Sequence, residues 1–396
     1  MEYISKELKK GIKIHYIKTD IFKTNLIAIF LTTKLEKDTV TLNTLIPAVL
    51  RRGSKTMPTQ ESISKALENM YGASFDCGSE KIGDNQSLKF YIESLNNNFL
   101  LENENIMKQS IDKLLEIVFN PVLEENIFKD EYVQSEKINI KQLIKSKIDM
   151  KDKYAQERCI EIMYEGKPYG VYKYGYEEDL EKISAKELYE QYKNLIQNCK
   201  IDIFVSGDFN DEEIEKILNE NENIKKLQER DAQYIENNEE TEKKEEQEIK
   251  TIEEKLDVTQ GKLVIGLDVK EYSKDSRYAV SLYNVILGGS ANSKLFQNVR
   301  EKASLAYTTG SIYLRQKNNI FIKAGIEIEN YEKALDIIKK QLEDMQNGNF
   351  TQDDIEKAKR YMLYGIRAIE DDQELGISYY IAQELSRVKR KFERVY

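Results

Sequence analysis

The chain has 396 residues, of which 40% are hydrophobic and 33% are charged, and its formal net charge is −10. This length favours two or more domains, and the negative balance argues against a nucleic acid or an anionic membrane as partner. The sequence has no run of about 18 apolar residues, so we expect no membrane span.

A single histidine, His15, excludes any site in this chain that needs two imidazoles. It lies in an alternating stretch, where a period of two places it with Lys13 on the polar face of a strand, and we therefore expect a solvated histidine. The three cysteines are far apart and form no CxxC pattern, which predicts free thiols in a reducing compartment. With no apolar signal core at the start, a cytoplasmic location follows as an expectation.

The first half of the chain alternates between strand and helix patterns. Residues 11–18 and 25–33 predict strands, and the apolar spacing of residues 41–50 predicts a helix. Thr59 is placed to cap a second helix that Gly72 ends. A strand at 88–92, amphipathic stretches from about 100 to 148, a helix capped by Ser184 and a strand at 201–207 complete this half.

A charged stretch separates this half from the next. Residues 229–254 are rich in Glu and Lys, which cannot bury apolar area, so the stretch predicts a solvated acidic linker. We therefore predict a first domain at 1–228, the linker at 229–254 and a second domain at 255–396. Residues 263–269 open the second series of strands and helices.

The two halves repeat one pattern. Gly53 and Gly289 each follow an apolar helix, and Tyr71 and Tyr307 each come 18 residues later, before a further strand and an amphipathic helix. The fold expectation is α+β, with two homologous domains that each pack helices on an antiparallel sheet. The second domain is expected to be shortened or open, because the helix and strand at 184–207 have no counterpart in it.

Residues 288–307 hold the candidate site. A glycine pair lets the backbone approach a ligand closely, and a helix long enough to reach Tyr307 would place Arg300 and Tyr307 on one face, two turns apart. A guanidinium and a phenol together can grip a peptide carbonyl. The alternative reading is an exposed arginine beside Glu301 and a tyrosine in the core.

A duplicated α+β unit with an R-x6-Y element in its second copy resembles the insulinase/pitrilysin family of zinc peptidases, which includes the mitochondrial processing peptidases. Within that family, residues 20–25, 70–73 and 298–307 are most similar to inactive bacterial paralogues associated with 5-aminopentanol modification of elongation factor P. The resemblance implies an inverted H-x-x-E-H zinc motif just upstream of Gly53, where this chain has Thr44, Pro47 and Ala48. It therefore implies no metal and no peptide hydrolysis by this chain alone.

The resemblance also implies a role for the second domain. In the family, the Arg and Tyr hold the substrate backbone near a zinc ion that another domain or another subunit supplies. Carried over, this makes Arg300 and Tyr307 substrate-binding residues, with Ser290 and Asn292 as further candidates that also suit a simple turn. The leading expectation is a non-catalytic subunit of a heterodimeric zinc peptidase, whose zinc-bearing paralogous partner carries the cofactor.

Two other readings stay open. The chain is alternatively a scaffold or accessory binding protein in elongation factor P modification, with no part in proteolysis. The third reading is a standalone enzyme with a carboxylate site, although nothing in the sequence groups the Asp and Glu residues into one.

Overall fold

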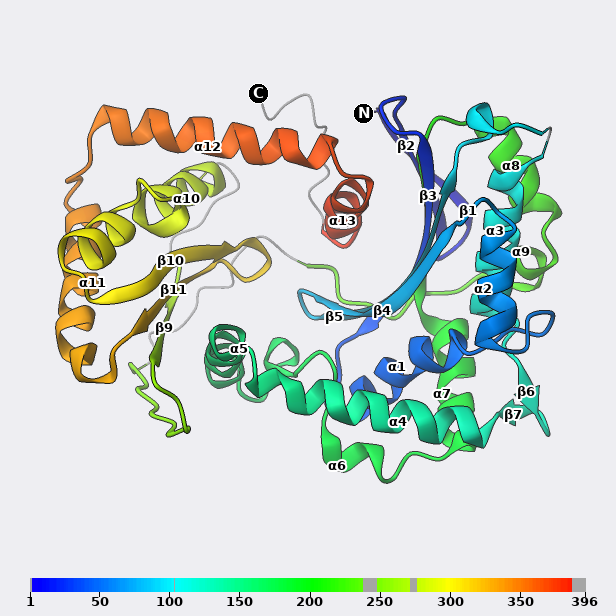
Figure 1. The fold of residues 1–396 in the computed structure, drawn as a ribbon, viewed down its shortest axis with the longest axis horizontal. Coiled ribbons are helices and arrows are strands. Elements are labelled where there is room, and N and C mark those ends of the chain that lie inside the picture. The colour runs from blue at the N-terminus through cyan, green and yellow to red at the C-terminus, as the bar shows by residue number, and fades with distance from the viewer. Residues whose placement is uncertain (1, 103, 238–247, 271–275, 387–396) are drawn as a thin grey trace.

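The computed structural model describes residues 2–102, 104–237, 248–270 and 276–386 (Figure 1). Its first half is built on a six-stranded sheet in the order β1-β2-β8-β3-β5-β4. Every neighbouring pair is antiparallel except β2 and β8, which run parallel. The strands span β1 (Glu2–Lys9), β2 (Ile12–Lys18), β3 (Thr24–Lys34), β4 (Ser74–Ile82), β5 (Asn85–Leu95) and β8 (Lys200–Gly207).

Helices cover one face of this sheet and bury the larger apolar core. The strands at 11–18, 25–33, 88–92 and 201–207 and the helix at 41–50 are confirmed. The side chains of Thr59 and Ser184 each cap their helix through a complete capping box. The helices are α1 (Lys37–Leu50), α2 (Gln60–Glu68), α3 (Ile106–Phe119), α4 (Asp130–Lys145), α5 (Lys151–Met163), α6 (Glu177–Leu180), α7 (Ala185–Asn198), α8 (Asp211–Glu220) and α9 (Glu222–Lys226), with a two-stranded β6 (Leu123–Glu124) and β7 (Ile127–Phe128).

The second half holds a three-stranded antiparallel sheet in the order β10-β11-β9. Its own helices pack on one face of this sheet. On the other face, Ile160 and Met163 of α5, from the first half, pack against Phe321 of β11. The elements are β9 (Gly261–Asp268), α10 (Arg277–Asn284), η4 (Val285–Gly289), η5 (Phe296–Lys302), β10 (Ala306–Leu314), β11 (Asn319–Ile326), α11 (Tyr331–Gln346), α12 (Gln352–Glu370) and α13 (Gln373–Glu384). The predicted α+β class is confirmed.

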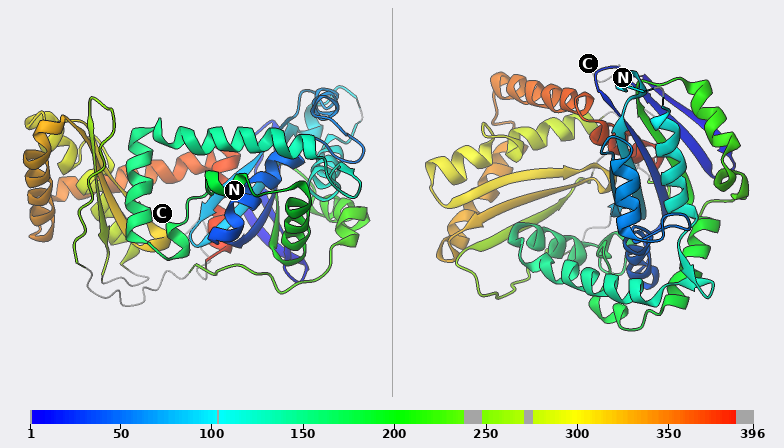
Figure 2. Two further views of the ribbon diagram at one scale, coloured as in Figure 1. Left: turned by 90° about the horizontal axis from the view of Figure 1, so that it is seen from below. Right: turned by 45° about the vertical axis from the view of Figure 1, so that its right-hand side comes forward.

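The last two helices connect the halves. Helix α12 runs from the helices of the second half to the first, and α13 lies against the open face of the six-stranded sheet (Figures 1 and 2). Ile377, Tyr380 and Ile381 of α13 join Phe30 and Phe204 in a separate buried cluster. Each sheet therefore receives one helix from the other half of the chain.

The position of α13 corrects the prediction for His15. The expected solvated side chain is fully buried, because the face that alternation assigns to the solvent lies under a helix that begins more than 350 residues later in the chain. Its ring stacks on Phe204 with 4.3 Å between ring centroids. Period-two alternation identified the face correctly but not what covers it.

The predicted linker is partly packed. Arg230 and Asn237 are buried, and the backbone N–H of Asn237 donates to the carbonyl of Leu385 over 2.7 Å. Because the backbone N–H of Arg230 also donates to the carbonyl of Lys10, the segment 229–237 packs on the first half and on the end of α13, which differs from a fully solvated linker. The most acidic stretch, 238–247, lies outside the described residues. At the far end of the predicted linker, Glu254 accepts a hydrogen bond from the hydroxyl of Tyr154 over 2.8 Å.

Candidate functional site

The segment 288–307 begins with a helix end and not with an open glycine loop. Gly288 lies so close to β10 that a Cβ atom on it would be 2.5 Å from the backbone nitrogen of Ser311. The missing side chain therefore accommodates the strand, and the prediction that this glycine frees backbone for a ligand is wrong at Gly288. The short helix η5 follows and ends at Lys302.

Arg300 and Tyr307 do not share a helical face as predicted. Ser304 adopts a left-handed backbone with φ 53°, and Tyr307 is already the second residue of β10. A residue in the left-handed region of backbone conformations cannot continue a right-handed helix, so the helix ends before Ser304. The sequence offered no glycine or proline to mark that break.

Both side chains are nevertheless exposed. Arg300 lies 4.7 Å from the ring centroid of Phe296 and 3.7 Å from a carboxylate oxygen of Glu301. The hydroxyl of Tyr307, whose side chain is 51% exposed, donates to Glu327 over 2.9 Å, and this hydrogen bond raises the pKa of Tyr307. Among the described residues no hydrogen bond joins Arg300 to Tyr307, and each donor faces an exposed carboxylate.

Ser290 and Asn292 lie in the turn between η4 and η5. The carbonyl of Ser290 accepts from the backbone N–H of Ser293 over 3.0 Å, and Gln297 donates to the carbonyl of Ala291 over 2.8 Å. The turn is thus held by its own backbone and by the side-chain amide of Gln297, with Asn292 exposed and Ser290 half-buried.

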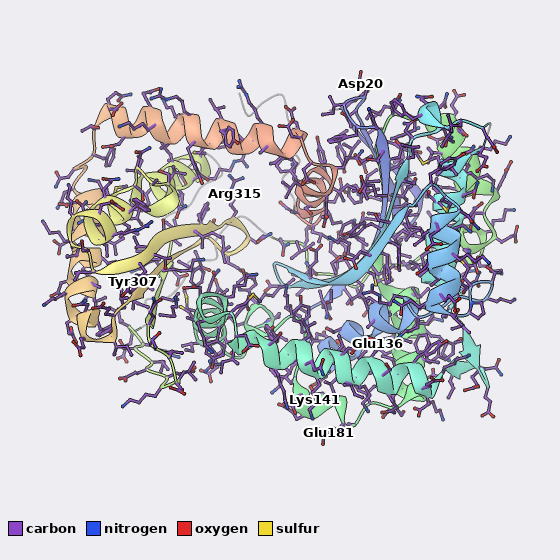
Figure 3. All side chains as sticks on the ribbon, in the orientation of Figure 1. Asp20, Glu136, Lys141, Glu181, Tyr307 and Arg315 are labelled. Atoms are coloured by element: carbon purple, nitrogen blue, oxygen red, sulfur yellow. The ribbon has the colours of Figure 1, made fainter. Side chains whose placement is uncertain are left out.

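The positions of the zinc motif lie on α1 in the other half. Thr44 and Pro47 are buried and Ala48 is half-buried. The hydroxyl of Thr44 donates to the carbonyl of Val40 over 2.9 Å, as a helical threonine often does. In Figure 3, Tyr307 lies in the half opposite α1.

A buried glutamine fills the space beside Thr44. The amide nitrogen of Gln86, on β5, lies 3.2 Å from the Thr44 hydroxyl and 3.3 Å from the carbonyl of Lys173. Its amide oxygen accepts from Asn43 over 3.0 Å. Gln86 is fully buried, so hydrogen bonds between α1, β5 and the 171–176 loop occupy the place where the resemblance put a metal.

The donor set here does not fit zinc. Thr44, Pro47 and Ala48 offer no imidazole or carboxylate, and the buried carboxylate on the neighbouring helix α4, Glu136, is paired with Arg52. Zinc in proteins takes thiolate, imidazole or carboxylate ligands. The sequence reasoning missed Gln86, although three polar residues at 85–87 at the start of a buried strand are a usable signal.

Replacing Gln86 by leucine is expected to lower the free energy of unfolding by about 2 kcal/mol. The change removes the acceptor of the buried amide nitrogen of Asn43, and a buried donor without a partner costs about 1–3 kcal/mol. The carbonyl of Lys173 keeps the hydroxyl of Thr44 as a donor. Urea unfolding followed by circular dichroism measures this loss of unfolding free energy. Gln191→Leu, which removes a half-buried partner of Asn43, is the control and should cost less than half as much.

Comparisons with known proteins decide the family. Residues 182–362 match a family model described as "Peptidase M16 inactive domain". A protein of Bacillus subtilis (strain 168) described as "Probable inactive metalloprotease YmfF" is 36% identical over 363 residues, which are 91% of this chain and 84% of that protein. This chain belongs to the M16 peptidase family.

Solved structures agree with an M16 fold. A conserved protein from Enterococcus faecalis V583 superposes with a TM-score of 0.86 at 26% identity, over 99% of this chain and 91% of that one. A peptidase M16 inactive domain from Pseudomonas fluorescens gives 0.71 at 16% identity, over 97% and 87%. The resemblance drawn from the sequence is confirmed as far as an inactive M16 homologue. Within the described ranges, no helix is both long and apolar enough to cross a bilayer.

Proposed function

We propose that this M16 homologue is the non-catalytic subunit of a heterodimeric zinc peptidase. The observation that carries the proposal is the contrast between its two candidate sites. The zinc-motif positions are closed by the Gln86 hydrogen bonds, whereas Arg300 and Tyr307 stay exposed. An inactive chain that keeps its substrate-holding residues suits a partner that supplies the chemistry.

In this division of labour, the chain binds and the partner reacts. The zinc ion, which supplies the activated water, belongs to a paralogous partner subunit. Arg300 and Tyr307 donate hydrogen bonds to a carbonyl of an extended peptide, and Ser290 and Asn292 offer further polar contacts beside it. Holding the peptide in one orientation reduces the entropy that the reaction on the partner must lose.

A cleavage assay tests the proposal. This chain, a zinc-bearing M16 chain of the same organism and an equimolar mixture are each incubated with a library of fluorogenic peptides. We expect cleavage by the mixture at least about tenfold above the sum of the separate chains, and zinc bound in the mixture at one ion per pair. Equal rates in the mixture and in the partner alone contradict the proposal.

The scaffold reading is the alternative that the same assay decides. Arg300 and Tyr307 each already contact a carboxylate within the chain, an arrangement that also suits a surface with no substrate. A chain that forms a stable complex with a non-peptidase protein of elongation factor P modification, and leaves cleavage unchanged, is that scaffold.

A further inference from the structure

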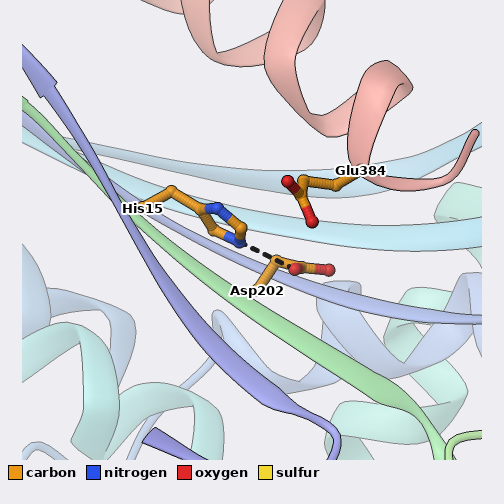
Figure 4. A group of neighbouring side chains, drawn as sticks. All are labelled: His15, Asp202 and Glu384. Atoms are coloured by element: carbon orange, nitrogen blue, oxygen red, sulfur yellow. Dashed lines mark hydrogen bonds and ion pairs between the residues drawn. The ribbon is translucent and has the colours of Figure 1, made fainter. Parts of the chain in front are cut away.

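A buried cluster of ionisable groups joins the two ends of the chain (Figure 4). His15 of β2, Asp202 of β8 and Glu384 of α13 bring one side-chain atom each to within 4.8 Å of one another. The Nε2 atom of His15 lies 2.8 Å from Oδ1 of Asp202. Both of these side chains are fully buried, and 3% of the Glu384 side chain is exposed.

Two ammonium groups argue against a metal in this cluster. Lys13 lies 2.9 Å from Oε2 of Glu384, and Lys200 bonds Oδ1 of Asp202. With a neutral imidazole, two lysines balance two carboxylates. A divalent cation added beside them would face both ammonium groups at short range in a medium of low dielectric constant.

Geometry also argues against a catalytic triad. The hydroxyl next to His15 is that of Tyr3, 2.9 Å from Nδ1. Burial and the charge of Glu384 raise the pKa of Tyr3 well above its usual range, so this phenol is a poor nucleophile. The cluster is better explained by what it holds together.

The cluster lies where α13 meets the first sheet. Tyr3 stacks on Tyr380 of α13 with 3.9 Å between ring centroids, and its hydroxyl also lies 3.0 Å from Oε1 of Glu384. The polar contacts thus cross between strands near the start of the chain and a helix near residue 384. The charged or titratable groups facing His15 come from four elements and the packed segment: Tyr3 (β1), Lys13 (β2), Lys200 and Asp202 (β8), Tyr234 (segment 229–237), and Tyr380 and Glu384 (α13).

The contacts assign one tautomer to His15. Asp202 accepts at Nε2, which therefore carries the proton, and Nδ1 faces the hydroxyl of Tyr3. The hydroxyl of Tyr3 donates to Oε1 of Glu384, and its oxygen lies 2.9 Å from Nδ1 of the ring. A second proton on the fully buried ring would add a third positive charge beside Lys13 and Lys200.

We propose that the cluster of His15, Asp202 and Glu384 is an acid-sensitive latch that holds α13 on the first sheet. While the imidazole is neutral the charges balance and the helix stays docked. Protonation of His15 unbalances the cluster, and release of α13 lets water solvate the added charge.

The direction of each pKa shift gives the pH range. Burial lowers the pKa of His15 from its ordinary value of 6.5. As the pH falls below about 6.5, the undocked form therefore binds a proton at His15 that the docked form does not bind. The pKa values of Glu384 and Asp202 are also lowered, by the hydrogen bond from Lys13 and by the charge of Lys200 respectively, both against the cost of burial. Their contribution is present above their ordinary values of 4.5 and 3.8 and is lost as the pH falls further.

Nuclear magnetic resonance on the whole chain tests the protonation state, since His15 gives the only imidazole signals. In 15N-labelled protein at pH 7.5 we expect Nε2 protonated and Nδ1 unprotonated, with a midpoint below 6.5 on titration. An imidazolium at pH 7.5, or a midpoint above 6.5, overturns the latch.

Hydrogen exchange tests the release of α13. Protection factors, corrected for the intrinsic pH dependence of exchange, are measured between pH 7.5 and 5. We expect those of α13 to fall by up to tenfold per pH unit below 6.5, the limit for one linked proton, while those of α3 in the main core stay constant. Constant protection of α13 while His15 titrates overturns the proposal.

A pair of variants tests the charge balance without touching the histidine. Glu384→Gln leaves Lys13 unpaired and is expected to lower α13 protection at least tenfold already at pH 7.5. Glu215→Gln, which removes the α8 partner of Lys6 on β1 in an exposed ion pair, is the control and should change nothing. Equal behaviour of the two variants contradicts the latch.

Discussion

Replacing Arg300 by alanine together with Tyr307 by phenylalanine is expected to lower peptide cleavage by the mixed complex at least about 100-fold. The change removes up to five guanidinium donors and one phenolic hydroxyl from an exposed surface. Losing one oxyanion-hole donor in a peptidase costs about 100- to 1000-fold in kcat, and we take the lower end for donors that hold the peptide backbone. Steady-state kinetics of the mixture, with kcat and KM separated, measures the loss.

Folding and assembly should be unaffected, because both side chains bond only exposed groups on their own surface. The control is the double variant Arg360→Ala with Tyr361→Phe. These two residues form another exposed arginine–tyrosine pair, located on α12, and Tyr361 is 50% exposed. Size-exclusion chromatography should show the same complex for both double variants. Full activity in the Arg300 and Tyr307 variant would rule out the peptide-holding role and leave the scaffold.

Replacing Gly175 by alanine is expected to cost about 2–5 kcal/mol of unfolding free energy. Gly175 adopts φ +79°, which a residue with a Cβ atom tolerates at a cost of about 1–2 kcal/mol. The new Cβ would also lie 2.1 Å from Oγ1 and 2.7 Å from Cα of Thr41, so helix α1 must shift. Overpacking of this kind adds about 1–3 kcal/mol.

The chain provides a matched control in Gly72. Its φ is +74°, and a Cβ atom there would meet nothing within 4 Å, so Gly72→Ala reports the backbone term alone. Urea unfolding of both variants should give a small loss for Gly72→Ala and a difference of at least about 1 kcal/mol between them. Equal losses would mean that the 171–176 loop does not pack tightly on α1.

Local patterns in the sequence predicted most elements of the first half. A threonine or serine before an amphipathic run identified the starts of α2 and α7, because their capping hydrogen bonds involve residues only three positions apart. Alternation likewise located β2, and a continuous apolar run located β3. These signals depend on neighbours in the chain.

Two of the failures share one cause, which is contact between distant parts of the chain, and the third is a local backbone conformation. The burial of His15 depends on α13, and the closing of the zinc-motif positions depends on Gln86 from a different strand. The end of η5 depends on a left-handed serine, Ser304, that no sequence rule marks. A single sequence holds no direct record of such contacts.

Helix α5 packs on the sheet of the second half and α13 on the sheet of the first, which has a consequence for synthesis on the ribosome. Strands of the first sheet are made early, but Phe30 and Phe204 on its second face are covered only when α13, at 373–384, has been made. Long-range closure of this kind is slow, and exposed apolar faces promote aggregation during synthesis. Between the synthesis of β8 and that of α13, the nascent chain therefore presents an apolar sheet face, a natural binding surface for a chaperone.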